Sequence, residues 1–118
     1  MITLTKDNFD EVVANNALIV IDFWALWCGP CISFAPIFEK VAAKYPDITF
    51  AKVDIDQEPQ LAADFNVRSI PQIVIMKEKI VVYSESGLLP ISALQVIVEQ
   101  AINLDLTEVH KKIDEENK

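Results

Sequence analysis

The chain has 118 residues, 52% of them apolar, and its 10 basic and 18 acidic side chains give a net charge of −8. This length and composition predict one domain with a single well-filled core. The acidic balance argues against nucleic acid as a partner, because phosphates need clustered lysine and arginine. No apolar run reaches the ~20 residues of a membrane-spanning helix, so we expect no membrane partner.

The N-terminal residues predict a cytoplasmic protein whose first helix begins after a polar turn. Residues 1–4 carry no basic stretch followed by an apolar segment, which a secretory signal would need. Residues 5–8, Thr-Lys-Asp-Asn, are typical of a helix start, and Phe9, Val12 and Val13 then supply an apolar face.

Residues 18–25 read Leu-Ile-Val-Ile-Asp-Phe-Trp-Ala, a nearly continuous apolar run. Such a run predicts a strand that is buried on both faces, as in a sheet covered by helices on both sides. The next element is an amphipathic helix with an internal proline, Pro36, which should remove one backbone hydrogen bond and kink the helix. Its apolar side chains recur at steps of three and four: Phe34, Ile37, Phe38, Val41 and Tyr45.

The remaining elements alternate in a way that predicts an α/β fold. The sequence indicates a strand at 49–53, a short helix at 60–65, a hairpin of strands at 73–76 and 80–83, and a helix from 91 to 102. The order, βαβ followed by ββα, predicts a central mixed sheet with helices on both faces. Residues 1–103 form the predicted domain. Residues 104–118 form a charged C-terminal extension, for which a continued helix and a loose tail both fit.

The only two cysteines lie two residues apart in Trp27-Cys28-Gly29-Pro30-Cys31. Gly29 permits a tight turn, and Pro30 suits an early helical position, where no hydrogen-bond donor is lost. Cys28 is therefore expected at a helix N-terminus, where free N–H groups and the helix dipole stabilise a thiolate. Cys31 falls in the first turn and is more shielded, so we predict that Cys28 attacks a disulfide and Cys31 resolves the product.

Two other interpretations of the cysteines are weaker. A structural zinc site needs about four ligands, and the chain offers besides the cysteines only the distant His110, which we expect to be an ordinary polar residue. Two inert structural thiols would not need to flank Gly-Pro. In a cytosolic chain, a lone Cys-x-x-Cys beside a βαβ pattern favours redox chemistry.

Asp22 is unusual because an ionised carboxylate inside an apolar strand is costly without a partner. One interpretation is a solvated residue at a strand end. The other is a buried acid with a raised pKa, placed behind the cysteines to take and return a proton. Lys52 on the next predicted strand either reaches across to modulate Asp22 or is simply solvated. For Ile70-Pro71, the frequencies of X-Pro bonds favour a trans peptide in a turn.

Several segments together resemble the thioredoxin family. They are Asp22-Phe23-Trp24-Ala25, Trp27-Cys28-Gly29-Pro30-Cys31, Ala35-Pro36, Lys52-Val53-Asp54-Ile55-Asp56 and Ile70-Pro71. The resemblance runs from about residue 5 to 102. It implies a thioredoxin fold, in which a mixed sheet of four to five strands is flanked by four helices.

The resemblance also implies roles for individual residues. Asp22 matches the family's buried acid and Lys52 its partner, and Pro71 should be cis beside the cysteines, contrary to the expectation from X-Pro frequencies. A substrate-docking surface would comprise Trp27, Gly29, Pro30, Ile70, Pro71, Gly87 and Leu88. No cofactor is expected to be bound. A flavin-containing thioredoxin reductase would restore the dithiol with electrons from NADPH.

Three positions near the cysteines depart from the usual family pattern. Leu26 replaces a residue that is often acidic, Ile32 replaces a frequent lysine or arginine, and Gln72 follows the proline where threonine is common. The hairpin at 77–79 also lacks the usual glycine. Leu26 and Ile32 make the rim of the site more apolar, which bears on the choice of partner.

We therefore predict a monomeric, cytoplasmic protein-disulfide reductase that carries electrons to disulfide-containing client proteins and serves cell redox homeostasis. Two alternatives stay open from the sequence. One is an oxidase or isomerase of the same fold that acts outside the cytosol. The other is a non-catalytic binding module that uses the apolar rim of Leu26 and Ile32.

Overall fold

The structure is a computed structural model that describes residues 1–117. Its elements in chain order are β1 (Ile2–Thr3), α1 (Phe9–Asn15), β2 (Leu18–Trp24), α2 (Gly29–Lys44), β3 (Thr49–Asp54), α3 (Pro59–Asp64), β4 (Gln72–Lys77), β5 (Ile80–Ser86), α4 (Ile91–Asn103) and α5 (Thr107–Glu116).

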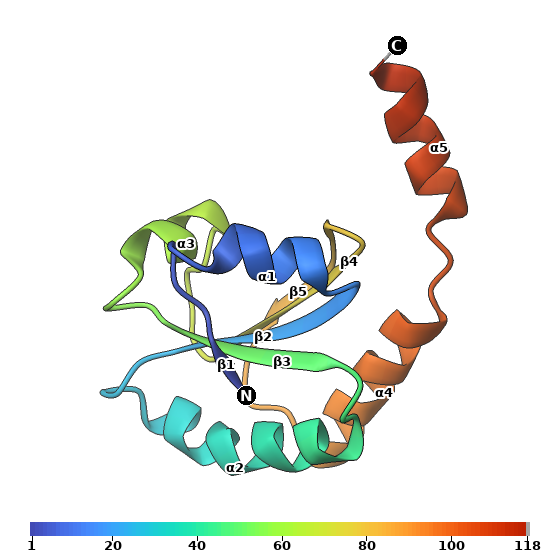
Figure 1. The fold of residues 1–118 in the computed structure, drawn as a ribbon. Coiled ribbons are helices and arrows are strands. Elements are labelled where there is room, and N and C mark those ends of the chain that lie inside the picture. The colour runs from blue at the N-terminus through green and yellow to red at the C-terminus, as the bar shows by residue number, and fades with distance from the viewer. Residues whose placement is uncertain (118) are drawn as a thin grey trace.

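The strands form one five-stranded mixed sheet in the order β1-β3-β2-β4-β5. The first three run parallel, and β4 and β5 are antiparallel to their neighbours. In Figure 1, α1 and α3 lie on one face of the sheet and α2 and α4 on the other. The predicted α/β class is confirmed. The sequence pattern did not indicate β1, because two residues are too few to show a period.

The central strand β2 is buried on both faces, which explains its nearly continuous apolar sequence. Val20 packs into a cluster with residues of α2 and α4, whereas Ile19, Ile21 and Phe23 pack into a second cluster on the side of α1 and α3. All four side chains are at most 1% exposed. Burying each such side chain stabilises the fold by roughly 1.5–3 kcal/mol, so the strand that leads to the cysteines is held firmly.

The β4–β5 hairpin turns without glycine. Glu78 and Lys79 adopt positive φ angles of 52° and 70°, the backbone that a tight two-residue hairpin requires at both central positions. Lys77, the last residue of β4, donates hydrogen bonds from its Nζ to the carbonyl oxygens of Ala101 (2.8 Å) and Ile102 (2.9 Å). These bonds satisfy carbonyls at the end of α4.

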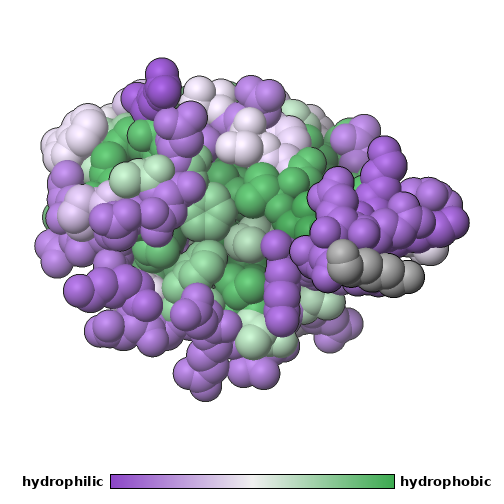
Figure 2. All heavy atoms as spheres, turned by 90° about the horizontal axis from the view of Figure 1, so that it is seen from above, coloured by the Kyte–Doolittle hydropathy of each residue, from purple (hydrophilic) through white to green (hydrophobic). Residues whose placement is uncertain are grey.

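The C-terminal extension contains a separate helix rather than a continuation of α4. Three residues intervene after Asn103, among them the buried Leu106, before α5 begins. In Figure 1, α5 stands away from the sheet, and its hydrophilic side chains gather on the right of Figure 2. His110 on α5 lies 3.0 Å from Glu78 of the hairpin, measured between Nε2 and Oε1.

Residues 1–117 show neither a helix fit to span a membrane nor a cluster of metal ligands. None of their helices combines the length and the apolarity that crossing a membrane would need. Likewise, no three of their histidine, cysteine, aspartate or glutamate side chains gather as metal ligands would.

Candidate active site

The two cysteines lie where the chain leaves β2 and enters α2. Cys28 is the N-cap residue of α2, Cys31 lies in its first turn, and Pro30 occupies one of the first two helical positions. The two sulfurs form a disulfide, with the Cα atoms 5.2 Å apart. Their exposed fractions are only 5% and 1%. A short path from a rigid strand into a helix therefore fixes both thiols, as the Cys-x-x-Cys spacing predicts.

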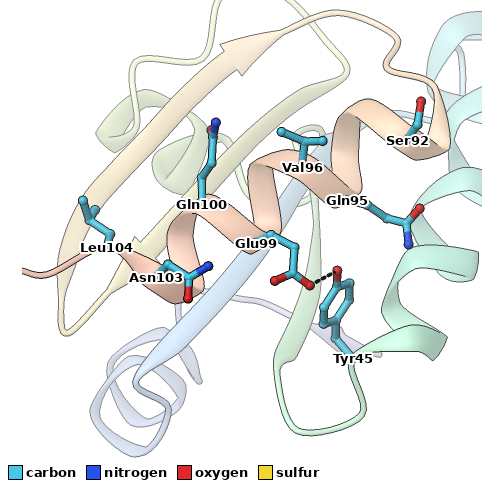
Figure 3. Close-up of a pocket in the computed structure, with 8 residues that line it drawn as sticks. All are labelled: Tyr45, Ser92, Gln95, Val96, Glu99, Gln100, Asn103 and Leu104. Carbon is cyan, nitrogen blue, oxygen red and sulfur yellow. Dashed lines mark hydrogen bonds between the residues drawn. The ribbon is translucent and has the colours of Figure 1, made fainter.

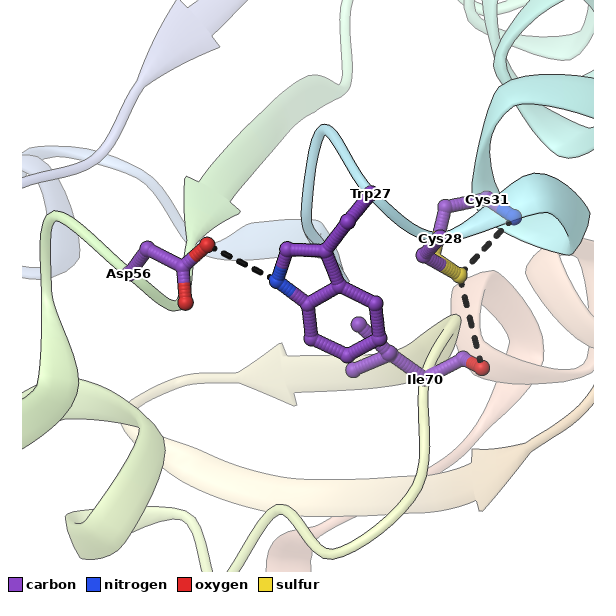
Figure 4. The surroundings of a disulfide bond; sticks show 5 residues. All are labelled: Trp27, Cys28, Cys31, Asp56 and Ile70. Carbon is purple, nitrogen blue, oxygen red and sulfur yellow. Dashed lines mark hydrogen bonds between the residues drawn. A yellow bond between two sulfur atoms is a disulfide. The ribbon is translucent and has the colours of Figure 1, made fainter.

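The surroundings of the Cys28 sulfur favour negative charge. The backbone N–H of Cys31 donates to Cys28 Sγ at 3.2 Å, and the first turn of α2 contains no acidic residue. The carbonyl oxygen of Ile70 lies 3.8 Å from the same sulfur (Figure 4) and, as an acceptor, does not contribute to this effect. A sulfur at a helix N-terminus that already accepts a backbone hydrogen bond is well placed to ionise once the disulfide is reduced.

The loop that faces the disulfide ends, directly before β4, with a cis peptide bond between Ile70 and Pro71. The expectation of a trans bond, based on X-Pro frequencies, is wrong here, and the expectation from the family resemblance is confirmed. Pro71 is buried, and its carbonyl oxygen accepts a hydrogen bond from the N–H of Gly87 at 2.9 Å. Gly87 has a φ of +123°, which side chains rarely tolerate. The segments at 70–71 and 87–88 therefore lie side by side.

Apolar side chains project into solvent around the disulfide. Leu26 and Trp27 are 74% and 69% exposed, and Ile32 and Leu88 are each 51% exposed. Gly29 and Pro30 are exposed in the first turn of α2. Exposed large apolar residues gathered in one place are typical of a binding surface.

Trp27 is held in place by a residue that the sequence did not indicate. Its indole Nε1–H donates to Oδ2 of Asp56 at 2.9 Å (Figure 4). Asp56 follows β3 in a turn in which its own N–H donates to Oδ1 of Asp54 at 2.9 Å. No periodicity links residues 27 and 56, so only the fold shows that the two side chains meet.

Of the two interpretations of Asp22, the structure supports the buried acid and not the solvated residue at a strand end. It lies in the middle of β2 with an exposed fraction of 0%, and neither carboxylate oxygen has a hydrogen-bond partner among the described residues. Burial raises the pKa of the Asp22 carboxyl to about 7, and the positive charge of Lys52 lowers it only in part. An acid with such a pKa is close to half ionised at neutral pH and can both accept and return a proton.

Lys52 pairs with Asp22 in the parallel register of β2 and β3. Its ammonium, however, lies over the ring of Trp24, with Nζ 4.9 Å from the ring centroid. Trp24 in turn packs against the cluster of Ala25 and the two cysteines. Trp24 had no predicted role of its own, although its position two residues after Asp22 places it on the same face of β2.

The structure thus brings most of the predicted residues to one end of the sheet. A separate hollow lies over the outside of α4, with Tyr45 beside it, and the Tyr45 hydroxyl donates to Oε1 of Glu99 at 2.6 Å (Figure 3). None of the residues predicted for the site lines this hollow.

Comparisons with known proteins agree with this geometry. The family model described as Thioredoxin matches residues 1–100. A relative from Streptomyces coelicolor is 45% identical over 115 residues, which cover 98% of this chain and 86% of the relative. The thioredoxin C-3 of Corynebacterium nephridii is 43% identical over 102 residues, which cover 86% of this chain and 70% of that protein.

Solved structures share the fold. The thioredoxin of Fasciola hepatica matches with a TM-score of 0.79 and 35% identity over 85% of this chain and 98% of that one. A mutant thioredoxin of Halobacterium salinarum matches with a TM-score of 0.81 and 30% identity over 88% and 92% of the two chains. The disulfide at the start of α2 stands in the family's active-site position. The chain belongs to the thioredoxin family, and it is a thiol–disulfide oxidoreductase that acts as a disulfide reductase and redox carrier.

Proposed function

We propose that this protein reduces client disulfides with Cys28 as the nucleophile and Cys31 as the resolving thiol. The observation that carries this assignment is the position of Cys28 as N-cap of α2, where its sulfur accepts the N–H of Cys31. Helix N-terminal donors lower the pKa of a thiol, and only the thiolate attacks.

The first step starts from the reduced protein, in which both cysteines are thiols. The Cys28 thiolate attacks one sulfur of the client disulfide, a bond forms between Cys28 and that sulfur, and the client S–S bond breaks. The departing client sulfur leaves as a thiolate and takes a proton from solvent. The product is a mixed disulfide between Cys28 and the client.

The second step releases the client. Asp22 accepts the proton of the Cys31 thiol, and the new thiolate attacks Cys28, forming the intramolecular disulfide and expelling the second client thiolate. The client gains two electrons and the protein loses two. The unpartnered, buried carboxylate with a pKa of about 7 supports this role for Asp22, and Lys52 tunes its affinity for the proton.

The client docks beside the disulfide as an extended segment. Supporting this are the apolar exposed side chains around the cysteines and the carbonyl of Ile70, which lies 3.8 Å from Cys28 Sγ. We assign the docking surface to Trp27, Gly29, Pro30, Ile70, Pro71, Gly87 and Leu88. Asp56 belongs to it indirectly, because its carboxylate fixes the indole of Trp27.

The oxidised protein must regain two electrons after each cycle. We propose that a flavin-containing thioredoxin reductase supplies them from NADPH, and that the protein acts as a monomer in the cytoplasm. Membership of the thioredoxin family supports the reductase as partner. A cytoplasmic reductase requires a reduction potential that is low enough to reduce client disulfides and still above that of its own electron source.

Reduction of insulin tests this function in two separate arms. With dithiothreitol as the electron source, we expect the protein to accelerate precipitation of the insulin B chain, and failure would overturn the assignment as a disulfide reductase. With thioredoxin reductase and NADPH instead, we expect insulin-dependent oxidation of NADPH. Activity in the first arm without activity in the second, across several reductases, would overturn the proposed partner alone.

A further inference from the structure

Three side chains of two neighbouring strands share the face of the sheet that α2 covers. Asp22 and Trp24 lie two residues apart on β2 and therefore on the same face of the strand, and Lys52 lies directly opposite Asp22 on β3. Neighbouring strands lie only about 4.8 Å apart. The Lys52 ammonium therefore has the buried carboxylate within easy reach.

The ammonium nevertheless does not pair with that carboxylate. Within residues 1–117, no nitrogen lies within 4.0 Å of Asp22 as an ion pair, and both of its oxygens lack partners. Lys52 Nζ instead lies 4.9 Å from the centroid of the Trp24 ring, within the range of a favourable cation–π contact. The tryptophan and the carboxylate therefore compete for one cation.

The neighbours of Asp22 on β4 and at the start of α2 carry no positive charge that could replace that of Lys52. From β4, the neighbour of Asp22 in the register is the apolar Ile73, and the cysteine pair at the start of α2 packs against Trp24 and Ala25. Among residues 1–117, Lys52 is the charged group whose charge lowers the pKa of Asp22. The position of the Lys52 ammonium therefore determines the affinity of Asp22 for a proton.

We infer that Trp24 is a positioning residue for proton transfer: its ring holds the Lys52 ammonium away from Asp22, so that Asp22 can still bind the proton of Cys31. This inference rests on the proposed role of Asp22. Without the ring, the ammonium would settle beside the carboxylate, and a close opposite charge favours the ionised form. Asp22 would then be a poorer proton acceptor at neutral pH, although every atom of the catalytic groups would be present.

The test follows the titration of the Asp22 side-chain carboxyl carbon by NMR in the oxidised protein, where the cysteines do not titrate. We expect Trp24→Leu to lower the pKa of Asp22 by about 0.5 to 1 unit. Trp24→Phe, which keeps an aromatic face, should shift it far less. In the double variant Trp24→Leu/Lys52→Met, the pKa should return to the wild-type value or above it.

Two results would overturn the inference. One is an unchanged Asp22 titration in a folded Trp24→Leu protein. The other is an equal downward shift in the double variant, because the shift would then not act through Lys52. If Trp24→Leu does not fold, incorporation of fluorinated tryptophan in a Trp27→Phe background weakens the ring's negative face at nearly constant shape, and the pKa must still fall. Since the readout needs no turnover, it is independent of the insulin assay that tests the proposed function.

Discussion

Replacing Cys28 with serine should abolish disulfide reduction, lowering the rate of insulin reduction by at least roughly 10³-fold. A hydroxyl at this position is not ionised at neutral pH, so the first bond to the client cannot form. Cys31→Ser should instead permit the first attack and block the second. The protein should then accumulate as a covalent adduct with its client through Cys28, visible as a mass increase that dithiothreitol reverses.

The pair of variants discriminates between the two thiols because each lacks one sulfur and is otherwise identical. Both sulfurs are buried to a similar degree, so burial alone does not predict which one attacks. The positions of the two cysteines do predict it, because Cys28 precedes α2 and Cys31 lies within it. An adduct that forms through Cys31 in Cys28→Ser, and none in Cys31→Ser, would reverse the assigned roles.

Asp22→Asn should stabilise the oxidised protein at high pH, by up to about 4 kcal/mol above pH 8. The pKa of this carboxyl rises from 3.8 to about 7 on folding, so the folded state binds more protons than the unfolded chain between these values. Stability therefore falls as the pH rises through this window, and the full cost is present above about pH 7. An amide of the same shape never carries the charge and escapes this cost.

The pH dependence of the gain is the decisive observation. Near pH 4, where the folded carboxyl is protonated, we expect the variant and the wild type to unfold at nearly the same urea concentration. At pH 8 the variant should unfold at a higher one. Asp47→Asn, at an exposed turn residue, is the matched control and should show no such pH-dependent gain. A gain of equal size at both pH values would mean that the Asp22 charge is not its source.

A residue that lowers stability at neutral pH needs another reason for its presence, and proton transfer supplies one. The stabilised Asp22→Asn protein should therefore resolve mixed disulfides more slowly than the wild type, while Cys28 still attacks. One substitution at a buried position would thus raise the free energy of unfolding and lower the rate of turnover. That opposition is common at active sites, where strained or costly groups serve the chemistry.

The elements that place the cysteines were predictable because their patterns are long. The apolar run at 18–25 and the periodic pattern from Phe34 to Tyr45 each extend over several residues, and the structure contains both elements, as β2 and α2. Pro36 lies inside that helix, as predicted. By contrast, β1 is two residues long, and the separate helix α5 has a highly charged sequence whose pattern fitted a tail equally well.

The details of the site depended on contacts that no local pattern encodes. The nearly continuous apolar run of β2 indicated that Asp22 was unusual, but not whether its carboxyl was buried. The indole of Trp27 contacts Asp56, which lies 29 positions away in the sequence. Side-chain geometry likewise determines whether the Lys52 ammonium lies over Trp24 or beside Asp22. The cis bond before Pro71 contradicts the frequencies of X-Pro bonds and was expected only from the family resemblance.

Whether Cys28 is ionised at neutral pH can be measured from the rates at which iodoacetamide alkylates the two thiols of the reduced protein, followed as a function of pH by peptide mass spectrometry. We expect Cys28 to react fast at pH 7, with a midpoint below the ~8.5 of a free thiol, and Cys31 to react far more slowly. Equal, slow alkylation of both thiols at neutral pH would contradict the account, because no thiolate would then stand at the start of α2.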